Sequence, residues 1–332
     1  MTSPRTHPRS NPFDPFYRAI NTIAPSDKLR NLTDFPRIID VELTNTCNFH
    51  CLMCPVGTSV QVRKKGLMSD EVFHRVLDQA ALRGTPLRFI LWGEPTLHPK
   101  WLDWMEETVG RGLLAHFNTN GSRITEADMR RLVDSGVQSV KFSFQGVDEK
   151  SYREMRNTDY FEGLLAKVKL LHDLRGDAPS PYIHVSTTIT YEGPELVAQF
   201  RERISAFTDK ITVGRTELER FDVSKAKLTE AERAALTHMK GEEHLVRKHP
   251  NCPEVFDKLS VYWDGRVSAC CRDFDGVMLA GDVRTQTLAE IWKTDALDFY
   301  RERLARGEYD RFELCRVCWD YHGLQTPGLQ GL

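Results

Sequence analysis

Short apolar segments alternate with helical patterns along the chain between residue 37 and about residue 216. The apolar segments are rich in β-branched and aromatic residues, which predicts strands at 37–45, 87–95, 114–122, 137–146, 182–193 and 210–217. Strands that alternate with helices pair in parallel through right-handed crossovers. Six such units are too few for a closed eight-stranded barrel, so we expect an α/β fold with a partial (β/α)6 TIM-like barrel.

Residues that favour the start or the end of a helix mark the segments between these strands. Residues 69–84 begin at Ser69, a favoured N-cap, and stop at a glycine. Residues 125–136 begin at Thr125 with an acidic residue three positions later and also stop at a glycine. Residues 161–176 place leucines and a valine near helical spacing. These segments therefore predict crossover helices of the barrel.

The pattern changes after the sixth predicted strand. A further helix at 228–245 begins with a capping box and leads out of the barrel. Residues 258–271 alternate around Asp264-Gly265, which predicts a β-hairpin with a two-residue turn, and a short helix follows. We therefore predict four parts: an N-terminal arm at 1–36, a partial barrel at 37–228, a linking helix at 229–248 and a small hairpin-plus-helix domain at 249–332.

Composition narrows the class of protein. Hydrophobic residues make up 40% and charged residues 28%, and the formal net charge is −2, so nothing favours a broad electrostatic contact with nucleic acid or a membrane. No apolar run approaches the roughly 20 residues of a membrane span, and the N-terminus lacks the apolar stretch of a signal peptide. We expect a cytoplasmic protein, in which eight reduced cysteines point to metal or redox chemistry.

Motifs that suit a binding site follow the first four predicted strands. A C-x-x-x-C-x-x-C array follows the first strand, and the next three are followed by WGEP at 92–95, NTNG at 118–121 and SFQG at 143–146. Each motif alone is explained by a turn. In parallel α/β folds, however, ligands bind at the carboxyl ends of the strands. Four such motifs at one edge therefore predict a pocket.

The array places Cys47, Cys51 and Cys54 within one short loop. Zinc prefers four tetrahedral ligands, and His50 is available as a fourth. Three thiolates also hold a four-iron cluster and leave one iron open, which suits direct binding of a cofactor. The sequence alone leaves both interpretations open, although the spacing favours the cluster.

With this array the chain resembles the radical S-adenosylmethionine (radical SAM) family. The resemblance implies that the three cysteines hold a [4Fe–4S] cluster and that the open iron binds SAM. Reductive cleavage of SAM then gives a 5′-deoxyadenosyl radical, which abstracts a hydrogen atom from the substrate. It also implies an external one-electron donor such as flavodoxin or ferredoxin.

The same resemblance implies the SAM-binding residues. The family often has G-G-E-P after the second strand, and here the first glycine is replaced by Trp92. Glu94 suits the SAM ammonium because it is a carboxylate that faces a cation. Arg156 is expected to reach the SAM carboxylate, with a solvated helix-face arginine as the alternative. The implied contacts, to adenine, ammonium, ribose and carboxylate, are Met53, Gly93, Glu94, Asn120, Ser143, Gln145 and Arg156.

A second group of cysteines lies in the last quarter of the chain. Its pattern resembles the SPASM/twitch extension of the radical SAM family, and the short twitch form carries one auxiliary [4Fe–4S] cluster. The resemblance implies four ligands, which are Cys252, Cys270, Cys315 and Cys318. A Cys₄ zinc site is the alternative. Because Cys270 and Cys271 end a predicted strand, we expect their side chains on opposite faces, so that only one meets the cluster.

The cluster count and the cysteine spacing resemble those of aminocyclitol dehydrogenases. The resemblance implies a small polyhydroxylated substrate, such as a sugar, aminocyclitol or nucleotide sugar, whose alcohol is oxidised to a ketone with the auxiliary cluster as electron acceptor. Arg215 and Glu217 follow the sixth strand and are candidates for the proton acceptor, with His184 and Glu192 as weaker candidates.

Three other functions stay open at this point. Epimerisation or decarboxylation would start with the same radical, and epimerisation would need a hydrogen donor, for which Cys271 is the candidate; otherwise Cys271 is a packed thiol. Modification of a ribosomal peptide or protein is the second, because many enzymes with this extension act in that way. A non-catalytic electron carrier is the third, and it leaves the motifs at the strand ends unexplained.

Overall fold

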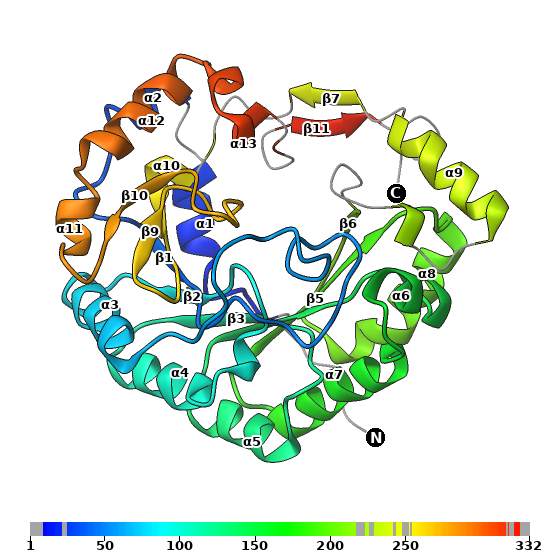
Figure 1. Cartoon of the computed structure of the whole chain (residues 1–332). Helices are drawn as coiled ribbons and strands as arrows, with labels where there is room; N and C mark the ends of the chain where they lie inside the picture. Colours follow the sequence, from blue (N-terminus) through cyan, green and yellow to red (C-terminus); the bar gives the residue numbers. More distant parts are fainter. Residues whose placement is uncertain are drawn as a thin grey trace.

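The computed structural model describes residues 9–21, 25–216, 223–225, 229–241, 244–247, 252, 254–316, 318 and 322–325. Six parallel strands follow the chain order in one sheet (Figure 1): β1 Ile38–Val41, β2 Leu87–Phe89, β3 Ala115–Thr119, β4 Ser139–Ser143, β5 Tyr182–Ile189 and β6 Lys210–Arg215. The expected α/β fold with a partial barrel is confirmed.

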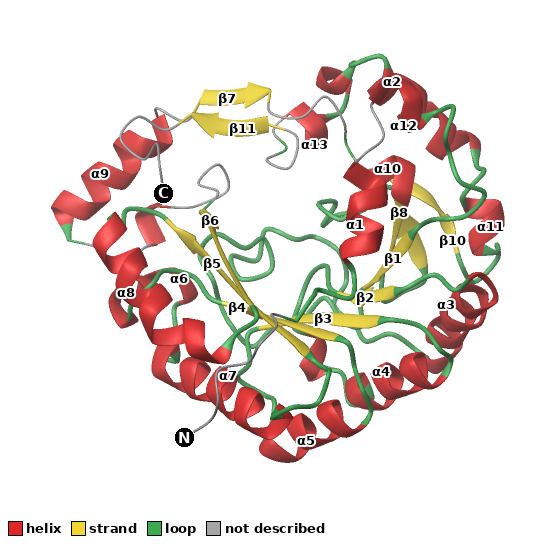
Figure 2. Cartoon of the chain, turned by 180° about the vertical axis from the view of Figure 1, so that it is seen from behind, coloured by secondary structure: helices red, strands yellow, loops and turns green. Residues whose placement is uncertain are grey.

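Helices cover the outer face of the curved sheet, as Figure 2 shows. Those between the parallel strands are α3 Asp70–Arg83, α4 Trp101–Gly110, α5 Glu126–Asp134, α6 Glu149–Arg156, α7 Phe161–Arg175 and α8 Pro194–Ile204. Ser69 caps α3 by accepting a hydrogen bond from the backbone N–H of Val72, and Thr125 and Asp128 form a reciprocal capping box on α5. The predicted starts of these two helices are therefore correct.

The sheet continues into the C-terminal region. Strand β8, Lys258–Val261, pairs in parallel with β1, and β9, Arg266–Ser268, and β10, Leu279–Asp282, extend the sheet in antiparallel fashion to nine strands. The predicted barrel and the predicted C-terminal domain thus share one sheet. The domain boundaries themselves stay predictions.

The turn of the predicted hairpin differs from the expectation. Val261 pairs with Val267, and the backbone N–H of Tyr262 donates to the carbonyl of Arg266, so three residues rather than two form the loop. Gly265 has φ 90°, the left-handed conformation that three-residue hairpin loops need at this position. The Asp-Gly pair therefore predicted the position of the turn correctly, but the predicted length of the loop was wrong.

The remaining helices surround the C-terminal region and the open side of the barrel. They are α1 Asp14–Asn21, α2 Pro25–Lys28, α9 Glu230–Gly241, α10 Glu254–Asp257, α11 Leu288–Ile291, α12 Asp295–Ala305 and α13 Glu313–Arg316. The linking helix expected at 229–248 ends at Gly241, and β7, His244–Arg247, pairs with β11, His322–Gln325. The predicted extent of that helix was therefore wrong.

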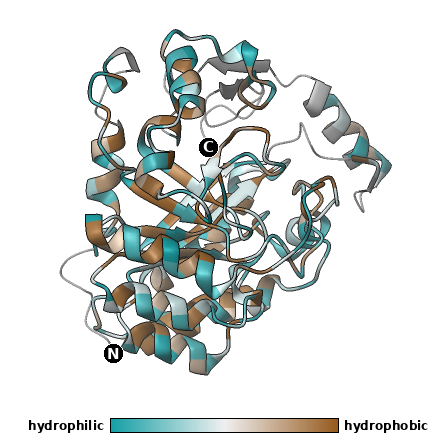
Figure 3. Cartoon of the chain, turned by 60° about the vertical axis from the view of Figure 1, so that its left-hand side comes forward, coloured by the Kyte–Doolittle hydropathy of each residue, from teal (hydrophilic) through white to brown (hydrophobic). Residues whose placement is uncertain are grey.

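The outer face of the sheet forms the main core. Phe89 and Phe117 are fully buried beneath the helices, where Phe73 of α3 stacks on Trp104 of α4 with ring centroids 4.2 Å apart. Figure 3 shows the hydrophobic residues along the strands and alternating with hydrophilic residues on the surrounding helices. This packing holds the strand ends in fixed relative positions.

The N-terminal arm closes one end of the barrel. Phe13 and Ile20, beside and within α1, are 1% and 3% exposed, and the ring of Phe13 contacts His116 edge-on. Arg88 donates a hydrogen bond to the Tyr17 hydroxyl and forms a bidentate pair with Asp40. The described part of the predicted N-terminal arm therefore packs on the barrel.

Candidate active site

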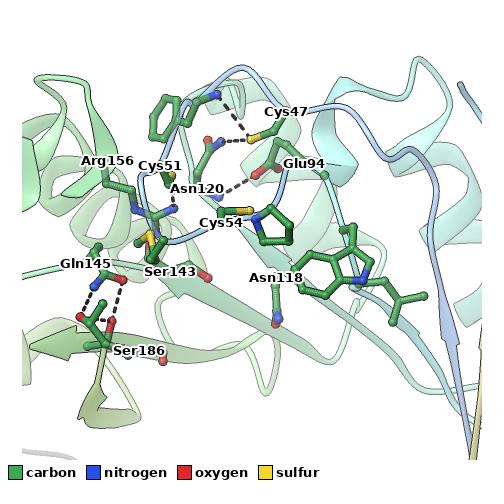
Figure 4. A pocket seen from close by; sticks show the side chains of 18 of the residues that line it. Cys47, Cys51, Cys54, Glu94, Asn118, Asn120, Ser143, Gln145, Arg156 and Ser186 are labelled. Carbon is green, nitrogen blue, oxygen red and sulfur yellow. Dashed lines mark hydrogen bonds between the residues drawn. The ribbon is translucent and has the colours of Figure 1, made fainter. Parts of the chain in front are cut away.

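A cavity of about 460 Å³ opens at the carboxyl edge of the parallel strands (Figure 4). It brings together the cysteine loop, the ends of β2 to β6 and part of the C-terminal region. Of the sequence-predicted site residues, those that line it are Cys47, Cys51, Met53, Cys54, Gly93, Glu94, Asn120, Ser143, Gln145, Arg156, Arg215 and Cys318. Glu217 lies outside the described residues.

The cysteine loop follows β1 and is fastened at both ends. The Thr44 hydroxyl donates to the carbonyl of Gly66, and the Asn45 amide donates to the carbonyl of Lys64. In the middle of the loop, the backbone N–H of Leu52 donates to the carbonyl of Met155 on α6 over 2.9 Å. The loop is therefore held against the barrel independently of any bound group.

Two glycines let the backbone approach closely around the thiols. A Cβ on Gly57 would lie 2.4 Å from the carbonyl oxygen of Cys51, and a Cβ on Gly93 would lie 2.4 Å from that of Thr44. Gly93 also has φ +89°, a conformation that other residues rarely adopt. Next to it, the backbone N–H of Glu94 donates to the carbonyl of Thr46. The WGEP segment is thus joined to the cysteine loop by its backbone.

The three thiols lie in a desolvated environment. Burial, together with the charges of Glu94 and the other two cysteines, raises the pKa of Cys47 to about 12. Burial also raises the pKa of Cys54. Thiols of this kind lose their protons when a metal centre binds and supplies positive charge. The donor chemistry of the loop therefore fits a metal centre.

Arg156, at the end of α6, lies directly against this loop. Its Nη1 is 3.5 Å from the Cys51 sulfur, and its Nη2 donates to the carbonyl of Ser143. Burial opposes the charge on the guanidinium, but the neighbouring Cys51 and Tyr152 raise the pKa of Arg156. Of the two interpretations of Arg156, the solvated surface arginine is wrong, because the side chain lines the cavity.

Glu94 is buried, and both of its oxygens accept hydrogen bonds. Oε1 accepts from the Thr96 backbone N–H and hydroxyl and from the Thr119 hydroxyl, and Oε2 accepts from the Asn120 backbone N–H at 2.7 Å. Burial raises the pKa of this carboxyl, whereas these hydrogen bonds lower it. The carboxylate connects the ends of β2 and β3 and holds Asn120 beside the cysteine loop.

Asn120 and Gln145 are likewise held by neighbouring side chains. The Asn120 Nδ2 donates to Asn48 at 3.1 Å and lies 3.8 Å from the Cys47 sulfur. The Gln145 amide donates to Thr216 and accepts from Thr188, as the dashed lines in Figure 4 show. Both amides are therefore fixed in orientation where they line the cavity.

Several lining residues were not identified from the sequence. Ser186 and Thr188 come from the inner face of β5, and Arg272 comes from the turn after Cys271. The alternation of inward-facing residues along β5 could have identified the two hydroxyl residues. No local signal could have identified Arg272, because its position depends on how the C-terminal region packs on the barrel.

The C-terminal cysteines come from three segments and lie near one another. Burial raises the pKa of Cys252, and the charges of Glu254, Cys318 and Cys315 raise it further. Interaction with the neighbouring Cys271 thiol raises the pKa of Cys270, and burial raises it further.

The premise that Cys270 and Cys271 end a strand is wrong. Strand β9 ends at Ser268, so both cysteines lie beyond it in a turn, where strand alternation does not apply. Cys270 lies near both Cys271 and Cys252.

Among the described residues, no group of three or more His, Cys, Asp or Glu side chains is arranged to hold a single metal ion. A tetrahedral zinc site would bring its sulfur ligands within about 4 Å of one another, given Zn–S bonds of about 2.3 Å. A four-iron cluster takes one thiolate at each iron corner and spaces them more widely.

A set of contacts joins the two cysteine regions. The Arg63 side chain forms a bidentate pair with the buried carboxylate of Glu42, at 2.8 and 2.6 Å, and donates from Nε to the carbonyl of Phe274. The ring of Phe274 contacts Trp92 edge-on, and the backbone N–H of Val62 donates to Asp275. The segment after the cysteine loop is thus fastened to the turn after Cys271.

Comparison with known proteins identifies two domains. The family model of the radical SAM superfamily matches residues 41–203, and that of an iron–sulfur cluster-binding domain, SPASM, matches residues 252–319. The AdoMet-dependent heme synthase of Methanosarcina barkeri is 28% identical over 169 residues, which are 51% of this chain and 47% of that protein. The chain thus matches about half the length of this relative.

Two solved structures share the fold. SuiB of Streptococcus suis, bound to the precursor peptide SuiA, has a TM-score of 0.63 and 15% identity, with 90% of this chain and 73% of that chain covered. BtrN in complex with AdoMet and 2-DOIA has a TM-score of 0.53 and 18% identity, with 84% of this chain and 91% of that chain covered.

No helix among the described residues is long and apolar enough to cross a membrane.

Proposed function

We propose that this chain, a radical SAM protein with a C-terminal SPASM domain, oxidises an alcohol group of a small polyhydroxylated molecule to a ketone. The two domains imply SAM and [4Fe–4S] clusters as cofactors. One observation carries the proposal: the loop with Cys47, Cys51 and Cys54 and the C-terminal Cys318 line the same cavity. A radical site and an electron acceptor that share one cavity suit a two-electron oxidation.

The proposal assigns the residues that hold these groups. Cys47, Cys51 and Cys54 hold the cluster that binds SAM, and four C-terminal cysteines hold the auxiliary cluster, namely Cys252, Cys270, Cys315 and Cys318. The buried, protonated thiols fit this assignment, and the Arg156 guanidinium offsets their charge after deprotonation. The SAM contacts are assigned to Met53, Gly93, Glu94, Asn120, Ser143, Gln145 and Arg156.

When bound, the cofactors would supply a radical that takes one hydrogen atom from the carbinol carbon and an acceptor for the electron that leaves with ketone formation. The hydroxyl proton would pass to a base, for which Glu217 stays the candidate from the sequence. The chain itself orients the substrate. Asn118, Ser186 and Thr188 present an amide and hydroxyl groups to the cavity, and such groups form hydrogen bonds with substrate hydroxyls. This polar lining supports a polyhydroxylated substrate.

The candidates for the proton acceptor occupy different environments. Arg215 lines the cavity, but a guanidinium remains protonated, so we assign it an electrostatic role rather than that of a base. Glu192 accepts hydrogen bonds from the backbone N–H groups of Thr190 and Tyr191, and His184 is hydrogen-bonded to Thr212. Neither of these two side chains lines the cavity.

The direct test uses reduced enzyme with SAM and a panel of sugars and aminocyclitols. The proposal predicts 5′-deoxyadenosine and a ketone in equal amounts, formed only when the correct substrate is present. Deuterium from solvent at the reacting carbon, with no ketone, would instead indicate epimerisation. Formation of 5′-deoxyadenosine only with a peptide would indicate peptide modification, and each of these two results would contradict the proposal.

A further inference from the structure

A buried histidine of β3 contacts a residue that lines the cavity. His116 is 8% exposed, and the ring of Phe13 lies edge-on against it at a centroid distance of 5.6 Å. Its Nδ1 is 2.9 Å from the hydroxyl of Ser139 on β4, and its Nε2 is 2.9 Å from Oδ1 of Asn118. Because alternate residues of a strand share a face, His116 and Asn118 lie on the face opposite to Phe117, inside the barrel.

The hydrogen bonds of His116 fix which ring nitrogen carries the hydrogen. Burial, together with the charges of Lys141 and Arg88, lowers the pKa of His116, so the neutral ring has one N–H donor and one acceptor. Oδ1 of Asn118 can only accept a hydrogen bond, so Nε2 is the donor. Nδ1 is then the acceptor, and the Ser139 hydroxyl donates to it.

These contacts fix the orientation of the Asn118 amide. Because Oδ1 faces His116, the two N–H groups on Nδ2 point elsewhere. Nδ2 has no hydrogen-bond partner among the described residues, and it is not one of their fully buried polar atoms. Asn118 lines the cavity (Figure 4), so it presents hydrogen-bond donors there rather than an acceptor.

Asn118 also lies beside residues assigned to SAM. Asn120 follows it by two residues, and Ser143 follows its register partner on β4, Lys141, by two residues. Two residues of a strand span about 7 Å. A carbon atom that gives its hydrogen to the SAM-derived radical must lie next to SAM. The reacting carbinol therefore lies in the part of the cavity that Asn118 borders.

We propose that Asn118 is a catalytic residue that donates a hydrogen bond to the oxygen of the reacting carbinol, and that His116 and Ser139 are positioning residues that hold its amide as a donor. The inference rests on the proposed function and deepens it. It identifies the group that acts on the oxygen atom whose bonding changes.

The oxidation requires this oxygen to carry charge. The C–H bond breaks as the hydrogen atom passes to the 5′-deoxyadenosyl radical, the O–H proton passes to a carboxylate base, and one electron passes to an iron–sulfur cluster, which leaves the C=O bond of the ketone. Loss of the proton places negative charge on the oxygen until the electron departs. A fixed donor such as the Asn118 amide stabilises this charge.

The first test measures the tautomer of His116 without turnover. The cluster-loaded, oxidised enzyme is labelled with ¹⁵N in its histidines, and the ring signals of His116 are those that disappear in His116→Gln. The inference predicts a hydrogen on Nε2 and none on Nδ1. A hydrogen on Nδ1 would mean that the amide of Asn118 presents its oxygen to the cavity, which overturns the inference.

The second test measures both products with the substrate that the panel of sugars and aminocyclitols identifies. Asn118→Leu keeps the size of the side chain but removes the donors, so ketone formation should fall about 100-fold. Hydrogen abstraction places no charge on the oxygen, so 5′-deoxyadenosine should fall less and exceed the ketone. Asn31→Leu is the matched control and should keep the two products equal, because the exposed Asn31 amide donates only to the carbonyl of Asp27. Parallel loss of both products in Asn118→Leu overturns the role of Asn118.

The positioning role of the histidine has its own measurement. His116→Leu should raise the ratio of 5′-deoxyadenosine to ketone. His116→Gln should bring the ratio back towards one, because an amide N–H can replace Nε2 as the donor to Oδ1 of Asn118. Equal ratios in these two variants overturn the positioning role. Absence of ketone from the wild-type enzyme with every probe defeats the proposed function instead, and the tautomer of His116 is measured independently of that result.

Discussion

The two cysteine regions place their thiols in opposite ways. Cys47, Cys51 and Cys54 lie in one loop that leaves a single strand, and one stretch of sequence fixes their spacing. The C-terminal thiols come from segments around residues 252, 270 and 315, which only the folded chain brings together. The comparison teaches that a local array can be identified from its spacing, whereas a distributed set depends on tertiary packing.

The largest expected effect comes from breaking the local array. Cys51→Ala removes one of three ligands, so SAM cleavage should fall below detection, because no other thiol lies in the loop to replace it. Iron should fall from about eight to about four atoms per chain, since the auxiliary cluster stays bound. Iron analysis and 5′-deoxyadenosine formation measure the two effects. Survival of SAM cleavage would show that the loop has another role.

A matched pair of variants breaks the distributed set. Cys270→Ala should remove the auxiliary cluster and about four iron atoms, whereas Cys271→Ala should keep the full iron content and the oxidation reaction. The two cysteines are adjacent in the chain and their thiols lie close together, so the pair controls for position. The opposite pattern would assign the ligand to Cys271. Loss of iron in neither variant would contradict the auxiliary cluster.

The third prediction concerns the contact that joins the regions. Arg63→Met leaves the buried Glu42 carboxylate without its partner, so the free energy of unfolding should fall by about 3–5 kcal/mol. The midpoint of urea unfolding measures this change. Arg284→Met is the control and should cost less than about 1 kcal/mol, because its pair with Asp282 is exposed. Equal effects of the two variants would show that the joining contact is not important for stability.

A smaller effect on the free energy of unfolding is expected from protonation of His184, which lies outside both cysteine regions. Burial, with the charges of Lys141 and Lys210, lowers the pKa of His184 to about 3. In the unfolded chain its pKa is about 6.5, so the unfolded state binds more protons between these values. The contribution of His184 to the free energy of unfolding is therefore largest above pH 6.5 and decreases as the pH falls towards 3.

Between pH 7.5 and 5.5 this histidine should cost the wild-type protein about 1.4 kcal/mol. His184→Gln should remove that part of the pH dependence while the rest of the profile stays the same. Urea unfolding of both proteins at the two pH values measures the difference. An unchanged pH dependence in the variant would show that His184 takes up a proton equally in both states.

Much of the fold followed from local signals in the sequence. The six parallel strands and the starts of α3 and α5 at Ser69 and Thr125 depend on periodicity and capping, which neighbouring residues decide. The pairing of β8 with β1 and the packing of α1 into the barrel could not be predicted, because contacts between distant parts of the chain decide them.

The site residues also divide into those that local signals predict and those whose positions depend on tertiary packing. The local array and the motifs at the strand ends predicted most of the cavity wall. Arg272 and the environment of Cys271 were missed because they depend on where the chain turns after β9. The contact of Glu94 with a cation stays a prediction, and the structure shows that its carboxylate holds the ends of β2 and β3 together.

The most direct test of the central claim asks which cluster binds SAM. The electron paramagnetic resonance signal of the reduced protein is recorded with and without SAM for the Cys252→Ala and Cys51→Ala variants. Because only the loop cluster has an open iron, SAM should shift the signal of Cys252→Ala and leave that of Cys51→Ala unchanged. A shift in Cys51→Ala, with none in Cys252→Ala, would contradict the account.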